Sequence, residues 1–181
     1  MNRKIILDLE TQKDLNEVGG HQYLHLLKVS VVGIYDYSDG RYKAFEEREI
    51  PRLEEILRET SLIIGFNIKR FDFPVLQPYL SLDLGKIPAL DIMEEFVKIK
   101  GHRISLQSLA SATLGEGKSG SGLEALRLYR VGDMKRLKDY CLDDVRLTKE
   151  LYEYGIKNRR LYYTSRSLFA MEKETIHVSW R

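Results

Sequence analysis

The chain has 181 residues, of which 43% are hydrophobic and 31% are charged, as in an ordinary soluble globular protein with room for one domain. Its formal net charge of +2 is too small to indicate a nucleic-acid-binding protein by itself, although acids gathered around metal ions would leave the remaining surface more basic. The single cysteine, Cys141, excludes an internal disulfide, gives no support for a thiolate zinc site and suits a reducing compartment. The N-terminal segment has neither the pattern of a signal peptide nor that of a membrane span. We therefore expect a cytoplasmic protein, or a nuclear one if its source has a nucleus.

The first third of the chain is predicted to form mostly strands. Asp39-Gly40 is a hairpin turn signal between two β-rich runs. Pro51 is well placed in the first turn of a helix that precedes a continuous apolar run, and such a run is typical of a strand buried on both faces. The expected strands are residues 4–9, 28–37, 41–45 and 61–66, and the expected helix is residues 51–60.

Helices are predicted to dominate the rest of the chain. Ser105 caps one of them, and Gly132-Asp133 divides the last long helical stretch. The glycine-serine loop 115–122 carries Lys118, which could reach a phosphate. This order, in which strands come first and helices then alternate with strands, predicts a mixed α/β sheet with helices packed on its faces. The expected helices are residues 70–79, 94–100, 105–114 and 123–157, with a short strand at 89–92 and a terminal hairpin formed by 161–166 and 175–180.

Asp8 and Glu10 lie two residues apart in a predicted strand, so both side chains lie on the same face of it. Their neighbours are apolar. Two like charges on one face of a mostly apolar strand repel each other and lose hydration, unless a cation neutralises them. The alternative is a solvated edge strand.

Asn67 and Asp72 flank a predicted strand-to-helix turn. The apolar strand 61–66 delivers Asn67 to its carboxyl end, where open α/β sheets usually place their sites. The alternative is structural: Asn67 would cap the following helix, and Asp72 would lie in its first turn.

Tyr140 and Asp144 lie four residues apart on a predicted helix, so they share one face. Asp143 lies roughly 100° around the helix from Asp144 and is expected to be an exposed spectator. The alternative is a surface aspartate beside a half-buried tyrosine.

The joint occurrence of the three acidic segments indicates a metal site more strongly than any one segment does. Hard oxygen ligands suit Mg²⁺ or Mn²⁺ rather than zinc. Two such ions about 4 Å apart stabilise the attacking and leaving oxygens of a displacement at phosphorus. A metal-dependent nuclease is therefore the leading hypothesis.

In these segments the chain resembles the DEDD superfamily of 3′–5′ exonucleases, which share a ribonuclease H-like fold, and in particular the exonuclease domains of family B DNA polymerases and small standalone relatives. The resemblance rests on DLET at 8–11, on GFNIKRFD at 65–72 followed by Pro74, and on YCLDD at 140–144. The related branch has a histidine five residues before the last aspartate. Asp139 occupies that position here, which favours the tyrosine (DEDDy) branch.

The resemblance implies roles for the catalytic and metal-binding residues. Asp8, Glu10 and Asp144 would hold one metal ion, and Asp8 would bridge to a second. Asp72 would assist through water. Tyr140 would orient the attacking water.

The resemblance also implies a substrate site and a domain division. Thr11, Asn67 and Phe71 would be the substrate-binding residues, the last two contacting the terminal nucleotide. The expected domain covers residues 1–158, with the C-terminal hairpin, 159–181, appended to it and without a counterpart in the motifs.

We therefore expect a 3′–5′ exonuclease that acts on single-stranded 3′ ends of DNA or RNA with two Mg²⁺ or Mn²⁺ ions. The alternatives are a non-catalytic nucleic-acid-binding scaffold and a structure-specific endonuclease of the same fold. A polymerase or helicase partner cannot be identified from sequence. A small basic cluster would either contact the nucleic-acid backbone or form an ordinary solvated face: Lys98, Lys100, His102 and Arg103.

Overall fold

The first strand, β1 (Arg3–Thr11), places successive side chains on opposite faces of the sheet. In the computed structural model, which describes residues 3–116, 122–166 and 171–180, Ile5 and Leu7 pack into one core. Ile6 packs into the core on the other face. Asp8 and Glu10 continue the series of Ile6, so they point to that second face.

β1 is the central strand of a five-stranded mixed sheet with the order β3-β2-β1-β4-β5. It runs antiparallel to β2 and parallel to β4, and β4 runs parallel to β5. β1 is therefore not a solvated edge strand, and the expected mixed α/β fold is confirmed. The other strands are β2 (Val29–Asp36), β3 (Arg41–Glu46), β4 (Thr60–Gly65) and β5 (Ala89–Asp91).

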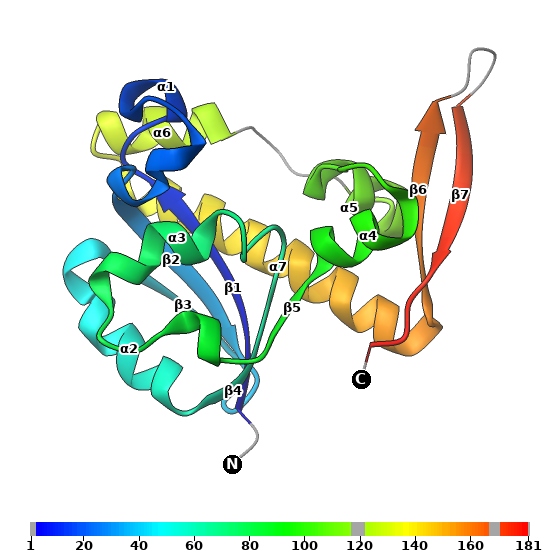
Figure 1. Ribbon diagram of the computed structural model, residues 1–181, viewed down its shortest axis with the longest axis horizontal. Coiled ribbons are helices and arrows are strands. Elements are labelled where there is room, and N and C mark those ends of the chain that lie inside the picture. The colour runs from blue at the N-terminus through cyan, green and yellow to red at the C-terminus, as the bar shows by residue number, and fades with distance from the viewer. Residues whose placement is uncertain (1–2, 117–121, 167–170, 181) are drawn as a thin grey trace.

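Helices cover both faces of this sheet, and the longest, α7 (Met134–Asn158), packs against β1 and β2 (Figure 1). The predicted break before it is confirmed. Gly132 has a φ of 74°, and Asp133 caps α7 by accepting a hydrogen bond from the backbone N–H of Arg136 at 3.2 Å. The other helices are α2 (Ile50–Arg58), α3 (Asp72–Leu76), α4 (Ile92–Lys100), α5 (Leu106–Leu114) and α6 (Gly122–Arg130), with 3-10 turns η2 (Glu47–Glu49), η3 (Gln77–Tyr79) and η4 (Leu84–Lys86).

Besides the 3-10 turn η2, the N-terminal third holds two helical segments that were not predicted from the sequence. They are α1 (Leu15–Val18) and the 3-10 helix η1 (His21–Leu26). Asp14 and Glu17 form a reciprocal capping box around α1, which satisfies backbone N–H groups that a short helix leaves unpaired. A second correction concerns residues 70–79, where the α-helix begins only at Asp72 and becomes 3-10 after Leu76.

The predicted C-terminal hairpin is present as β6 (Arg160–Arg166) and β7 (Met171–His177). Its second strand lies earlier than expected, because 178–180 are not part of it. Leu161 and Ile176 belong to the same core as Ile6. Of the predicted loop 115–122, residues 117–121, including Lys118, lie outside the described residues. Among the helices that the structure describes, none has both the length and the apolar character needed to cross a bilayer.

Candidate metal centre

Two of the candidate acids emerge from the central strand of the sheet. Asp8 lies opposite Gly33 of β2, and Glu10 lies opposite Val31. Both carboxylates are half-buried. The backbone that carries these two acids is paired with β2 on one side, and the N–H of Leu9 between them is held by the Asp72 carboxylate.

The third acid, Asp144, comes from α7, which approaches the sheet closely at Gly33. A Cβ atom built on Gly33 would lie 2.9 Å from the Sγ of Cys141 and 3.0 Å from a methyl carbon of Val145. A glycine at this position therefore allows the helix to come this near. The Cys141 thiol lies beside Asp8, with its Sγ 3.6 Å from the carbonyl oxygen and 3.8 Å from the carboxylate Oδ2.

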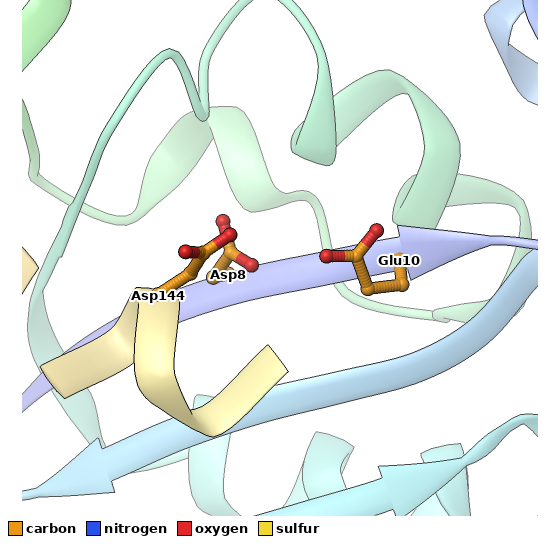
Figure 2. A group of neighbouring side chains, drawn as sticks. All are labelled: Asp8, Glu10 and Asp144. Atoms are coloured by element: carbon orange, nitrogen blue, oxygen red, sulfur yellow. The ribbon is translucent and has the colours of Figure 1, made fainter. Parts of the chain in front are cut away.

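Asp8, Glu10 and Asp144 converge at one point. Each offers a carboxylate oxygen that lies within 4.8 Å of the other two. Figure 2 shows the carboxylates of Asp8 and Asp144 turned toward each other, with that of Glu10 farther along the same strand. Asp144 is buried, with 5% of its surface exposed.

The donor set of these three residues fits a hard divalent cation. All three supply carboxylate oxygens, the ligands that Mg²⁺ and Mn²⁺ prefer. Ligands on opposite sides of a Mg²⁺ ion, at about 2.1 Å each, lie about 4.2 Å apart, which is compatible with the spacing in this group. A bound cation would also offset the mutual repulsion of three crowded carboxylates.

Asp72 lies beside this group rather than within it. Its buried carboxylate accepts a hydrogen bond from the backbone N–H of Leu9 at 3.0 Å, between the two acids of β1. Burial raises the pKa of the Asp72 carboxyl to about 8, and the nearby carboxylates of Asp91 and Asp144 add to this effect, although the Leu9 hydrogen bond opposes it. Asp72 also lies in the first turn of helix α3, as the structural alternative predicted.

Asn67 lies just beyond the carboxyl end of β4, as predicted, but it does not cap the following helix. Phe71 occupies the capping position of α3 and makes no side-chain cap hydrogen bond. Asn67 instead adopts a left-handed conformation with a φ of 65°, and its side-chain Oδ1 accepts a hydrogen bond from Arg103 at 2.8 Å. Phe71 is half-buried against the first core.

The other candidate residues have distinct surroundings. Tyr140 is half-buried and packs against a small separate cluster of buried residues contributed by β2, α6 and α7. The Thr11 hydroxyl donates a hydrogen bond to the Lys13 carbonyl at 2.8 Å. Asp143 is half-buried rather than exposed, and it forms an ion pair with Arg146 at 2.9 Å.

Three contacts to the predicted site were not foreseen from the sequence, although Arg103 belongs to the basic cluster that was expected to contact nucleic acid or form a solvated face. The Cys141 thiol contacts Asp8, Arg103 binds Asn67 across 36 residues, and the Asp91 carboxylate accepts the backbone N–H of Asn67 at 2.8 Å. Asp91 alone had a usable local signal, because an aspartate between a strand and a helix is a common N-cap. The other two contacts depend on tertiary packing.

Comparison with known proteins places this geometry in a family context. Residues 5–156 match the RNase_H superfamily. Among solved structures, the chain is similar to a family B DNA polymerase from the hyperthermophilic archaeon Pyrobaculum calidifontis, with a TM-score of 0.61 and 20% sequence identity over 86% of this chain. The match spans 25% of the polymerase chain. Comparison with curated protein sequences finds no significant match.

Proposed function

The chain belongs to the RNase_H superfamily, and on that premise we propose that it is a metal-dependent 3′–5′ exonuclease of the DEDDy type. Membership of this superfamily supports nuclease activity in general. The observation that carries the proposal is the convergence of Asp8, Glu10 and Asp144 within 4.8 Å. The motifs of the DEDDy branch, with Tyr140 rather than histidine, favour cleavage from the 3′ end.

In the proposed site, Asp8, Glu10 and Asp144 would hold one divalent ion, and Asp8 would also serve a second. Bound there, Mg²⁺ or Mn²⁺ would lower the pKa of a water ligand and stabilise the charge that develops at phosphorus. Asp72 would assist through water, because it lies outside the group of three carboxylates that converge.

Tyr140 lies one helical turn before Asp144, so both side chains are on the same face of α7. In the proposed mechanism its hydroxyl orients the attacking water. The new bond joins that water oxygen to phosphorus, and the bond from phosphorus to the 3′ oxygen of the preceding nucleotide breaks. The product is a nucleoside 5′-monophosphate and a strand shortened by one unit.

We also propose that the chain acts as a single domain in which the C-terminal hairpin is packed onto residues 1–158. Thr113 supports this arrangement, because its hydroxyl donates to the carbonyl of Tyr162 at 2.8 Å and accepts the N–H of the same residue at 2.9 Å. Thr11, Asn67 and Phe71 are the proposed substrate contacts of this domain.

The test uses 5′-labelled single-stranded DNA and RNA, incubated with Mg²⁺, Mn²⁺ or EDTA. We expect a metal-dependent ladder that shortens from the 3′ end with the wild-type protein, and none with Asp8→Asn. Asp143→Asn is the matched control, because it neutralises an aspartate of α7 outside the group. Internal cuts would favour an endonuclease, and metal-independent binding without cleavage would favour a scaffold. Full activity of Asp8→Asn would refute the assignment.

A further inference from the structure

A cavity of about 280 Å³ lies between the segment after β4 and helix α4, with Asn67 in its wall. This volume is close to the lower end of the range of about 300–1,000 Å³ for pockets that enclose small organic ligands. It therefore suits one phosphate with its sugar rather than a longer piece of a strand. The cavity thus adjoins a residue that we assign to the terminal nucleotide.

The walls of this cavity carry more positive than negative charge. Four basic side chains and two carboxylates line it. Both carboxylates are engaged: Glu94 pairs with Lys69 at 2.6 Å, and Asp91 accepts backbone N–H groups, including those of Asn67 and Lys69. In contrast, Arg70 and Arg103 form no ion pair with any residue in the part of the chain that the structure describes. Lys98 pairs with Glu95 at 2.7 Å, so the unpaired charge in the cavity is that of two guanidinium groups.

The contact between Arg103 and Asn67 fixes the orientation of the asparagine amide. A guanidinium has only hydrogen-bond donors, so the atom that it meets at 2.8 Å must be the amide oxygen. The amide NH₂ of Asn67 then remains as a donor directed elsewhere. The backbone N–H of Asn67 is also fixed, by Asp91 at 2.8 Å. These contacts hold Asn67 at its φ of 65°, a conformation that is unfavourable for most residues but tolerated by asparagine.

We propose that this cavity binds a phosphate group of the nucleic-acid substrate, with Arg103 as its anchoring cation and as the positioning residue for Asn67. A guanidinium carries five N–H donors in a planar fork that matches phosphate oxygens. One of them binds Asn67, and others remain for the phosphate. Asn67 then presents its NH₂ group to an acceptor of the terminal nucleotide. The proposal rests on the exonuclease function and names the part of the substrate that the site reads.

An internucleotide phosphate and the phosphate of a released nucleoside 5′-monophosphate both offer oxygens that a guanidinium can bind in this way.

The experiment measures binding of a fluorescent single-stranded oligonucleotide by anisotropy in EDTA, so that no turnover occurs. For Arg103→Gln we expect about 5- to 50-fold weaker binding and a slope of log affinity against log salt that is smaller by about 0.7, the loss of one phosphate contact. Arg52→Gln is the matched control, because Arg52 is an exposed arginine of α2 paired with Glu49, and we expect neither quantity to change.

Two further variants separate the roles of charge and positioning. Arg103→Lys keeps the charge, so the salt slope should stay near that of the wild type, while the loss of the guanidinium fork weakens binding several-fold. Asn67→Asp keeps an oxygen for Arg103 but replaces the NH₂ donor with an acceptor, so binding should fall although the protein remains folded. The melting temperature of each variant checks that it is folded.

Competition with a nucleoside 5′-monophosphate identifies which phosphate is bound. If the mononucleotide displaces the oligonucleotide equally from wild type and Arg103→Gln, the cavity takes an internucleotide phosphate. If it competes only with the wild type, the cavity takes the phosphate of the terminal nucleotide.

Unchanged affinity and salt slope in folded Arg103→Gln would overturn the subsite, and so would a wild-type protein that binds no oligonucleotide. A wild-type protein that binds through Arg103 but cleaves nothing with Mg²⁺ or Mn²⁺ would instead refute the exonuclease function alone.

Discussion

Replacing Asp72 by asparagine should make the metal-free protein more stable, because the buried carboxyl is held in an unfavourable state. Burial raises its pKa to about 8, whereas an aspartate in an unfolded chain titrates near 3.9. At pH 7 the folded state therefore takes up a proton that the unfolded state does not hold. The difference of about 3 units between pH 7 and the pKa in the unfolded chain lowers the free energy of unfolding by at most about 4 kcal/mol, at 1.36 kcal/mol per unit.

The sign of this effect gives the prediction its pH dependence. For an acid whose pKa is raised in the folded state, the loss of folding stability is absent below the unfolded-state pKa. It grows as the pH rises and is complete above the folded-state pKa. The stability gain of Asp72→Asn should thus be near zero at pH 4 and largest near pH 8. Asparagine keeps an oxygen that accepts the Leu9 N–H, so little is lost elsewhere. We expect a gain of about 2–4 kcal/mol at pH 7.

The assay is urea unfolding in EDTA at pH 4.5, 6, 7 and 8, followed by circular dichroism for wild type and variant. Asp143→Asn is the control, because its carboxylate is partly exposed and paired with Arg146. Its loss should cost no more than about 1 kcal/mol. A difference between Asp72→Asn and wild type that is flat, or that shrinks toward pH 8, would refute the dominance of burial. Under the proposed function the stabilised variant should also lose nuclease activity.

Three other predictions concern the metal centre. Gly33→Ala should lower the free energy of unfolding by about 1–3 kcal/mol and the activity at least 10-fold, because the new methyl group collides with the Cys141 thiol. The double variant with Cys141→Ala should recover part of both losses. No recovery would refute the packing argument. Tyr140→Phe should lower kcat by roughly 10²- to 10⁴-fold without changing the melting temperature, and a loss as complete as that of Asp144→Asn would indicate a different role. Mg²⁺ or Mn²⁺ at 100 times its Kd should stabilise the wild-type protein by about 2.7 kcal/mol, measured by thermal unfolding, and an equal gain in Asp144→Asn would contradict the assigned ligands.

The parts of the site that were predicted from sequence follow from local periodicity. Two-residue spacing in a strand places Asp8 and Glu10 on one face, and four-residue spacing in a helix does the same for Tyr140 and Asp144. Neither inference needs knowledge of the tertiary structure. The apolar character of residues 61–66 likewise predicted that Asn67 would follow the carboxyl end of a buried strand, and β4 ends at Gly65, just before it.

The parts that were missed depend on packing between distant segments. The approach of α7 to the sheet requires a glycine at position 33, but an isolated glycine in a strand does not reveal which helix it accommodates. The contact of Arg103 with Asn67 joins residues 36 apart, and no local pattern encodes it. The short helix α1 was missed for another reason: its Asp14–Glu17 capping box is a sequence signal, but a single turn lacks the apolar repeat by which helices are recognised.

The two groups of residues differ in the rigidity of the elements that carry them. Asp8 and Glu10 lie on the central strand of the sheet, where they pair with β2, and Asp144 lies on a helix of 25 residues packed against that strand. In contrast, Asn67 and Arg103 lie on connecting segments. Substitutions in such segments disturb the core less than those in packed elements. Preference for DNA or RNA should therefore vary through residues near Asn67 and Arg103, because contacts there can change without moving the three carboxylates.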